Sequence, residues 1–137
     1  MPPVQVAGID HIGLLVRDID ATLPWFTERL GFRLISDEIT MASGGARLVY
    51  LDAGNVILQL LSPTSDSGPI ATALAANGDG LHHICLSVDD IHGAVEGLAP
   101  GGDVPVVRGG RDRLTCFLPD RPGGLIIELT ETEPSQG

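Results

Sequence analysis

The sequence predicts an α+β fold made of two paired βαβββ modules, because the chain repeats itself at about half its length. The stretch His11–Ala21 returns 72 residues later as His83–Gly93, and both copies share the pattern His-Ile-x-Leu-x-Val-x-Asp-Ile. The later segments Val56–Leu61 and Leu125–Thr130 also correspond. So long a match is improbable by chance in a chain of 137 residues, so we infer an internal duplication.

Each half predicts one strand, one helix and three further strands. In the first half, Ile9–Val16 is a short apolar run rich in β-forming residues. Asp18 or Asp20 can cap the helix that follows, because a carboxylate accepts hydrogen bonds from the free N–H groups of the first turn. Gly31 suits the end of that helix. The remaining strands are expected at Phe32–Ile39, Ala46–Asp52 and Val56–Leu61, with a turn at Gly54-Asn55.

The second half predicts the same order of elements. It comprises a strand at 81–88, a helix at about 90–98, and strands near 104–107, 113–118 and 124–130. Between the halves lies a polar linker with a short helix at Pro69–Asn77. We expect one domain over 1–137, with module 1 at about 8–62, the linker at 63–80 and module 2 at about 81–131. A half of this size cannot bury both faces of its sheet, so the halves are expected to pair.

Composition narrows the function classes. The chain has 18 acidic and 8 basic residues and a formal net charge of −10, which disfavours nucleic acid or an anionic membrane as a partner. No apolar run approaches the roughly 20 residues that span a bilayer, and the first residues lack the features of a signal peptide. Cys85 and Cys116 form no CxxC or zinc spacing. We therefore expect two buried free thiols in a protein of the reducing cytoplasm.

Four polar residues interrupt apolar strands and match in pairs across the repeat. His11 and His83 occupy the same place on the first strand of each half, and Gln59 and Glu128 the same place on the last. A carboxylate flanked by apolar residues, as at Glu128, would cost several kcal/mol or stay protonated unless something offsets its charge. A divalent metal offsets that cost. The sequence thus predicts that the four side chains converge on one cation and leave positions open for water or substrate.

Each of these residues alone has a simpler interpretation. A single histidine on an apolar strand is more often structural than a ligand, Glu128 could lie at a sheet edge, and Gln59 could face solvent. The coincidence of four such residues at duplicated positions favours the metal. Other polar residues are expected to be structural or exposed, namely His82, His92, Asp89 and Asp90.

These residues lie in segments that resemble the vicinal-oxygen-chelate superfamily, which includes glyoxalase I, extradiol dioxygenases, bleomycin-resistance proteins and methylmalonyl-CoA epimerase. The resemblance covers residues 9–131 and is nearest to the epimerases. The segments that carry it are Ile9–Gly13, Leu58–Pro63, Gly68–Ala71, Gly78–Ile84 and Gly123–Leu129. The most specific of them is Gly78–Ile84, with the pattern Gly-x-Gly-x-His-His-Ile.

The resemblance implies a cupped mixed sheet around a divalent ion held by His11, Gln59, His83 and Glu128, and a homodimer. The ion could be Co, Mn, Ni, Zn or Mg, which all accept nitrogen and oxygen ligands. The expected activity is that of an epimerase or isomerase that removes the α-proton of a metal-chelated acyl-CoA, such as methylmalonyl-CoA, or of a related carbonyl acid, through an enolate. Glu128 is the expected catalytic carboxylate.

Two other functions fit the same frame, a glyoxalase I-like lyase and a non-catalytic small-molecule-binding or resistance protein. An extradiol dioxygenase is disfavoured because Gln59 would crowd its iron site. A second acid or base could come from Asp37 or Glu38, although solvated carboxylates are the simpler interpretation. Tyr50 could line a ligand-binding cup, whereas Trp25 and Phe26 suit core packing.

The basic residues are all arginines, and half of them lie between positions 108 and 121. Because the chain has no lysine, these arginines are the ones that could bind CoA phosphates. They are Arg108, Arg111, Arg113 and Arg121.

Overall fold

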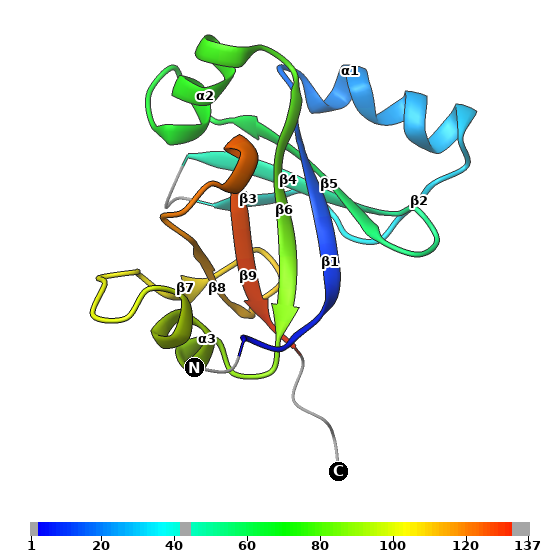
Figure 1. Cartoon of the computed structure of the whole chain (residues 1–137). Coiled ribbons are helices and arrows are strands. Elements are labelled where there is room, and N and C mark those ends of the chain that lie inside the picture. Colours follow the sequence, from blue (N-terminus) through cyan, green and yellow to red (C-terminus); the bar gives the residue numbers. More distant parts are fainter. Residues whose placement is uncertain (1–2, 42–44, 133–137) are drawn as a thin grey trace. The chain divides into compact units, whose positions relative to one another are not determined.

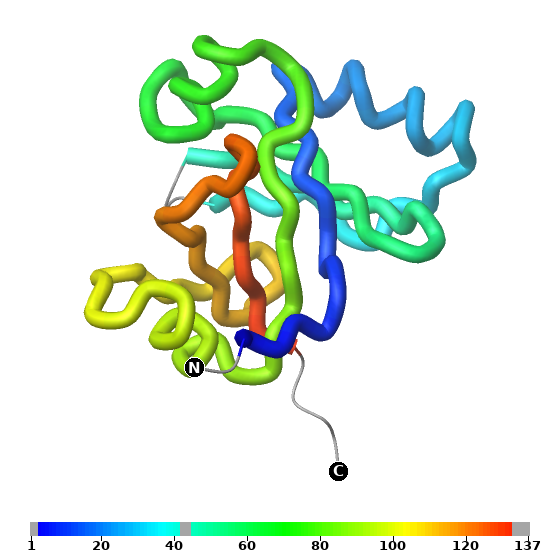
Figure 2. Tube along the Cα trace, in the orientation of Figure 1, coloured from blue at the N-terminus to red at the C-terminus, as the bar shows by residue number. Residues whose placement is uncertain are grey.

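The computed structural model describes residues 3–41 and 45–132, and the chain divides into two compact units. The N-unit is His11–His82, and the C-unit joins Met1–Asp10 to His83–Gly137. The boundaries between the units, after Asp10 and after His82, fall within strands β1 (Val6–Leu15) and β6 (Gly80–Val88), which are traced in Figures 1 and 2. The start of the chain therefore belongs with the second half of the sequence. The predicted boundaries of the modules and linker stay a prediction.

The N-unit contains the βαβββ order that the first half of the sequence predicts. After β1 come α1 (Ile19–Pro24), β2 (Arg33–Leu34), β3 (Ile39–Met41), β4 (Ala46–Asp52), β5 (Ile57–Pro63) and α2 (Pro69–Asn77). The strands are ordered β2-β4-β5-β1, and β3 also pairs with β4. β1 is parallel to β5, and the other pairs are antiparallel (Figure 1).

The two faces of the N-unit sheet bury different side chains, because successive strand residues point to opposite faces. The cluster that includes α1 is made of Val16, Ile19, Val49, Leu51 and Leu60. The cluster on the other face is made of Leu15, Ala46, Leu48, Tyr50 and Leu61, together with Leu74 of α2. This second face also carries His11 and Gln59, two of the predicted metal ligands.

The C-unit repeats this topology. After β6 come α3 (Ile91–Leu98), β7 (Val107–Arg108), β8 (Leu114–Phe117), a 3-10 turn at Pro122–Gly124 and β9 (Ile127–Glu131). The order β6-β9-β8-β7 matches β1-β5-β4-β2, and β6 is parallel to β9. One face packs against α3 through Val88, Ile91, Ala94, Cys116 and Leu129. The α+β class and the two βαβββ modules predicted from the sequence are confirmed.

The helix starts follow the duplication. Asp18 accepts a hydrogen bond from the N–H of Ala21 at 3.3 Å, and Asp90 accepts one from the N–H of Gly93 at 3.1 Å. The predicted capping role of Asp18 is confirmed. After Pro24, which has no N–H to continue the α-helical ladder, α1 passes into a π-helical turn at Trp25–Arg29.

One predicted strand is wrong in its extent. Instead of one strand over Phe32–Ile39, the chain forms β2 and β3 separated by a bend. Leu34 is opposite Leu51 but Ile39 is opposite Leu48, so two extra residues bulge between the two pairings with β4. The strands expected at 104–107 and 124–130 begin later, at β7 and β9. No helix in the described ranges, 3–41 and 45–132, is long and apolar enough to cross a membrane.

Candidate metal and active site

The N-unit places His11 and Gln59 on one face of its sheet. In the parallel pairing of β1 with β5, Gly13 is the partner of Gln59, so His11 lies two residues before the position opposite the amide. Residues two apart on a strand share a face. Both side chains are buried, with 4% of His11 and 5% of Gln59 exposed. The polar residues that interrupt the apolar pattern are therefore inside the protein.

Tyr50 fixes the orientation of the Gln59 amide. It lies directly across from Gln59 on β4, and its hydroxyl accepts a hydrogen bond from Gln59 Nε2 at 3.0 Å. The Tyr50 ring also packs edge-on against His11, with 5.8 Å between ring centroids. Gln59 Oε1 is buried and has no hydrogen-bond partner among the residues that the structure describes. A buried amide oxygen of this kind suits a cation ligand, because otherwise it loses its solvation without compensation.

The C-unit builds the equivalent pair from His83 and Glu128. Cys85 is the β6 partner of Glu128, so His83 again lies two residues before the position opposite the β9 side chain. His83 Nε2 and Glu128 Oε1 are 3.1 Å apart. The side chain of His83 is 2% exposed and that of Glu128 is 11% exposed. Phe117 lies across from Glu128 and packs edge-on against His83, with 5.5 Å between ring centroids.

The donor set of each unit fits a divalent metal. The N-unit offers an imidazole and an amide oxygen, and the C-unit offers an imidazole and a carboxylate. Nitrogen and oxygen ligands of this kind suit Zn, Co, Ni and Mn, and the oxygen ligands also suit Mg. The buried Glu128 carboxylate gives the C-unit pair a negative charge that a cation would neutralise.

The two thiols beside this carboxylate are free and buried, as the sequence predicts. Burial, followed by the charges of Glu128 and Asp10, raises the pKa of Cys85 far above its usual value. Burial also raises the pKa of Cys116, with a further contribution from Glu128. Both groups are thus neutral thiols at physiological pH.

Both suggested second acids or bases, Asp37 and Glu38, are exposed. Glu38 forms an ion pair with Arg47, and this hydrogen bond raises the pKa of Arg47. Arg47 neighbours Ala46 and Leu48 on β4, so it lies on the opposite face from Tyr50 and Gln59.

The other residues considered from the sequence have structural or surface positions. His92 is exposed on α3, and Asp90 caps that helix, as expected. Asp89 accepts a hydrogen bond from Thr132. Phe26 packs against the core cluster under α1, but Trp25 is 51% exposed, so its predicted core position is wrong.

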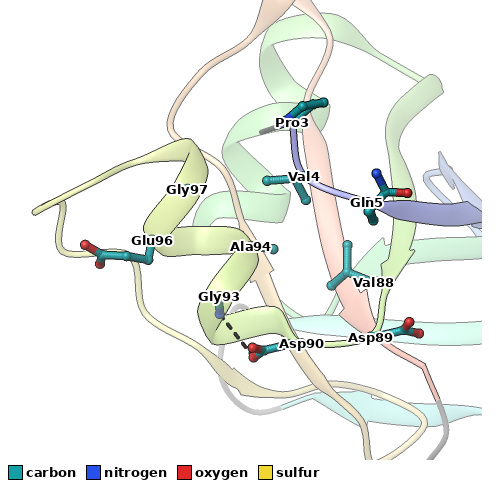
Figure 3. A pocket seen from close by; sticks show the side chains of 10 residues that line it. All are labelled: Pro3, Val4, Gln5, Val88, Asp89, Asp90, Gly93, Ala94, Glu96 and Gly97. Atoms are coloured by element: carbon teal, nitrogen blue, oxygen red, sulfur yellow. Dashed lines mark hydrogen bonds between the residues drawn. The ribbon is translucent and has the colours of Figure 1, made fainter. Parts of the chain in front are cut away.

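A separate hollow of about 430 Å³ lies in the C-unit, between the start of the chain and α3 (Figure 3). Its walls include Val4, Val88 and Ala94, and three carboxylates line it, from Asp89, Asp90 and Glu96. None of the predicted metal ligands lines this hollow.

Comparison with known proteins gives the family. The family model of the Glyoxalase/Bleomycin resistance protein/Dioxygenase superfamily matches residues 8–129. The chain belongs to this superfamily. It is 30% identical over 133 residues to the mitochondrial methylmalonyl-CoA epimerase of Homo sapiens, covering 93% of this chain and 75% of the human protein.

Similar solved structures agree with this family assignment. The methylmalonyl-CoA epimerase of Mycobacterium tuberculosis has a TM-score of 0.83 and 30% identity, covering 98% of this chain and 93% of that one. A variant of the Streptomyces coelicolor methylmalonyl-CoA epimerase, in complex with 2-nitronate-propionyl-CoA, has a TM-score of 0.82 and 29% identity, covering 95% and 100%. These likenesses support an epimerase-like enzyme on an α+β fold.

Proposed function

We propose that the protein is a metal-dependent epimerase that exchanges the α-proton of an acyl-CoA such as methylmalonyl-CoA. The observation that carries the proposal is the matched position of two buried side-chain pairs, His11 with Gln59 in one unit and His83 with Glu128 in the other. In each pair, the histidine lies two residues before the strand position opposite the second side chain. The epimerase relatives supply the substrate class.

The proposed ligands of one divalent ion are His11, Gln59, His83 and Glu128. Support comes from their burial, from the buried Gln59 Oε1 atom and from the duplicated positions of the four residues. When bound, such an ion supplies positive charge where negative charge develops on the substrate's carbonyl oxygen. Elemental analysis of the purified protein distinguishes Co, Mn, Ni, Zn and Mg as the bound ion.

Glu128 is the proposed base. It is the carboxylate of the proposed ligand set, and in this role its oxygen takes the α-proton as the acyl group becomes a planar enolate. Tyr50 contributes indirectly, because its hydroxyl holds Gln59 Nε2 and so orients the amide oxygen. The enolate is then protonated from solvent on its opposite face, which inverts the configuration, and Glu128 releases the abstracted proton to solvent.

The test is deuterium exchange from solvent into methylmalonyl-CoA, combined with elemental analysis of the purified protein. We expect exchange by the unaltered protein and its loss on chelator treatment or in Glu128→Ala. Glu96→Ala, an exposed carboxylate on α3, is the matched control and should keep full activity. Absence of exchange with any acyl-CoA would contradict the proposal. Turnover of methylglyoxal with glutathione would instead indicate a lyase, and ligand binding without metal would indicate a non-catalytic binding protein.

We further propose a homodimer that acts in the cytoplasm. Support for the dimer comes from exposed apolar side chains on strands β1 and β6, where Ile9 is 50% and Leu81 is 78% exposed. Support for a reducing compartment comes from the two free thiols. Sedimentation of the purified protein at micromolar concentration tests the dimer, and a single species with the mass of one chain would contradict it.

A further inference from the structure

A buried thiol lies beside the proposed base of the C-unit. In the parallel pairing of β6 with β9, Cys85 is the partner of Glu128, and partner residues of neighbouring strands point to the same face of the sheet. Cys85 also follows His83 by two residues, so it shares that face with both proposed ligands of the unit. It is 0% exposed. The Cys85 thiol is therefore a buried neighbour of the proposed base, to which the proposed function gives no role.

The duplicated position in the N-unit has no side chain, because Gly13 stands there opposite Gln59. That amide is held from its other neighbouring strand, where the Tyr50 hydroxyl accepts its hydrogen bond. In the C-unit the equivalent strand, β8, offers Phe117, whose ring carries no hydroxyl. Of the two strand neighbours of the Glu128 carboxylate, the thiol is therefore the one with a hydrogen-bond donor.

The thiol is protonated and donates to the carboxylate. Burial is the largest cause that raises the pKa of Cys85, followed by the charges of Glu128 and Asp10, and a hydrogen bond with Glu128 acts in the same direction. A hydrogen bond raises a thiol's pKa when the protonated form makes it, so the S–H group donates and the carboxylate accepts. Asp10 acts on the thiol through its charge, while its carboxylate contacts Arg111 and Arg113. A neutral thiol is also unsuited to bind the cation, because metals bind the thiolate.

Two groups from the same strand therefore hold the proposed base. His83 Nε2 lies 3.1 Å from Glu128 Oε1, and Cys85 donates from two residues further along β6. A glutamate side chain has several rotatable bonds, and contacts with neighbouring groups restrict it to one orientation. Proton transfer requires the base oxygen to lie within hydrogen-bonding reach of the α-proton, so a fixed orientation favours transfer.

We propose that Cys85 is a positioning residue, whose S–H group donates a hydrogen bond to the Glu128 carboxylate and holds it for proton transfer. The catalytic consequence rests on the proposed function, whereas the hydrogen bond exists without substrate and is tested separately. The alternative is that Cys85 only fills space in the core. Cys116 provides the comparison, because this second buried thiol of the C-unit is opposite Leu129 and packs on the face that α3 covers.

Infrared spectroscopy of the S–H stretch tests the hydrogen bond, since other protein groups absorb little in that region. The chain has two cysteines, so Cys116→Ala leaves the Cys85 band alone. We expect this band to move to higher frequency when Glu128→Gln is added, because a neutral amide is a weaker acceptor than a carboxylate. The Cys116 band, isolated in Cys85→Ala, should move much less on the same replacement. Equal shifts of the two bands, or an unmoved Cys85 band, would overturn the proposal.

Deuterium exchange into methylmalonyl-CoA tests the positioning role. For Cys85→Ala we expect kcat to fall about tenfold or more and KM to change by less than about twofold, because the base loses its orienting partner. Cys85→Ser supplies an O–H donor and should bring kcat back to within about threefold of the unaltered protein. Cys116→Ala removes the matched thiol from the opposite face and should keep kcat within about twofold.

A loss of rate in Cys85→Ala that serine does not restore would assign Cys85 to packing and overturn the proposal. An unchanged rate in Cys85→Ala, or an equal loss in Cys116→Ala, would do the same. Failure of the unaltered protein to exchange any acyl-CoA would refute the proposed function, and with it the positioning role. The infrared shift would still decide whether the hydrogen bond to Glu128 exists.

Discussion

The two halves of the proposed site share a geometry and differ in chemistry. Each unit offers a histidine as its first proposed ligand and, as its second, Gln59 in the N-unit or Glu128 in the C-unit. The histidine lies two residues before the strand position opposite the second ligand. An aromatic residue on the strand next to the second ligand packs edge-on against that histidine. The chemical differences are an amide in the N-unit against a carboxylate in the C-unit, and a tyrosine against a phenylalanine. Opposite the second ligand stands Gly13 in one unit and Cys85 in the other.

These differences assign separate tasks to the two units. In the N-unit, the Tyr50 hydroxyl fixes the neutral Gln59 amide, so this unit is suited to holding a cation. In the C-unit, Phe117 offers no hydrogen bond to Glu128. In the proposed mechanism, the C-unit therefore supplies the carboxylate that moves the proton. Backbone register preserves the geometry, while single side chains set the chemistry.

The largest expected effect comes from making the two second ligands alike. Glu128→Gln gives the C-unit the amide of the N-unit and removes the proposed base, so we expect the exchange rate to fall by about 10²- to 10⁴-fold. The double variant Gln59→Glu with Glu128→Gln restores the charge but puts the carboxylate beside Tyr50. It should exchange no faster than about tenfold above Glu128→Gln. The measurement is deuterium incorporation at saturating metal.

Recovery of near-normal exchange in the double variant would contradict this division of tasks. It would show that a carboxylate in either unit can serve as the base. Circular dichroism of each variant serves as the control that the fold is retained.

The internal repeat made most of this arrangement accessible from the sequence. The offset between His11 and His83 predicts the duplicated strands, and the apolar neighbours of Gln59 and Glu128 predict their burial. The position of the Gly54-Asn55 turn also implies that Tyr50 pairs with Gln59, because residues equally distant from a tight turn lie opposite each other. From the sequence, Tyr50 is predicted to line a cup, and the hydrogen bond from Gln59 adds an orienting role to that position.

Other features depend on contacts that no local pattern encodes. Between β8 and β9 the connection is long and includes a 3-10 turn, so the register of Phe117 with Glu128 cannot be counted from a turn. Asp10 and Arg111 are separated by 101 positions, and only the folded chain brings them together. The bend between β2 and β3 follows from two pairings with β4 that differ by two residues, which a run of apolar residues does not reveal.

A smaller effect is expected when the two aromatic positions are made alike. Tyr50→Phe gives the N-unit the ring found in the C-unit and leaves Gln59 Nε2 buried without its present hydrogen bond. We expect metal affinity to fall about 10- to 100-fold, because the ligand loses its orienting partner. The free energy of unfolding of the metal-free protein should fall by about 1–3 kcal/mol.

Competition with a coloured chelator measures the affinity, and urea unfolding measures the stability. Phe117→Tyr is the matched control, because that ring is 48% exposed and the added hydroxyl can reach water. Its effect on stability should stay within about 0.5 kcal/mol. An equal loss of metal affinity in both variants would show that ring packing, and not the Tyr50 hydroxyl, orients the ligands.

The smallest expected effects come from the duplicated helix caps. Asp18→Ala and Asp90→Ala each remove a carboxylate that accepts a hydrogen bond from the N–H group three residues later. Each variant should lower the free energy of unfolding by about 1 kcal/mol. If the N-unit and the C-unit unfold in one cooperative transition, both variants shift the same urea midpoint and the losses add in the double variant. If each variant shifts a different transition, the units unfold independently, and the strands β1 and β6 connect them without coupling their stability.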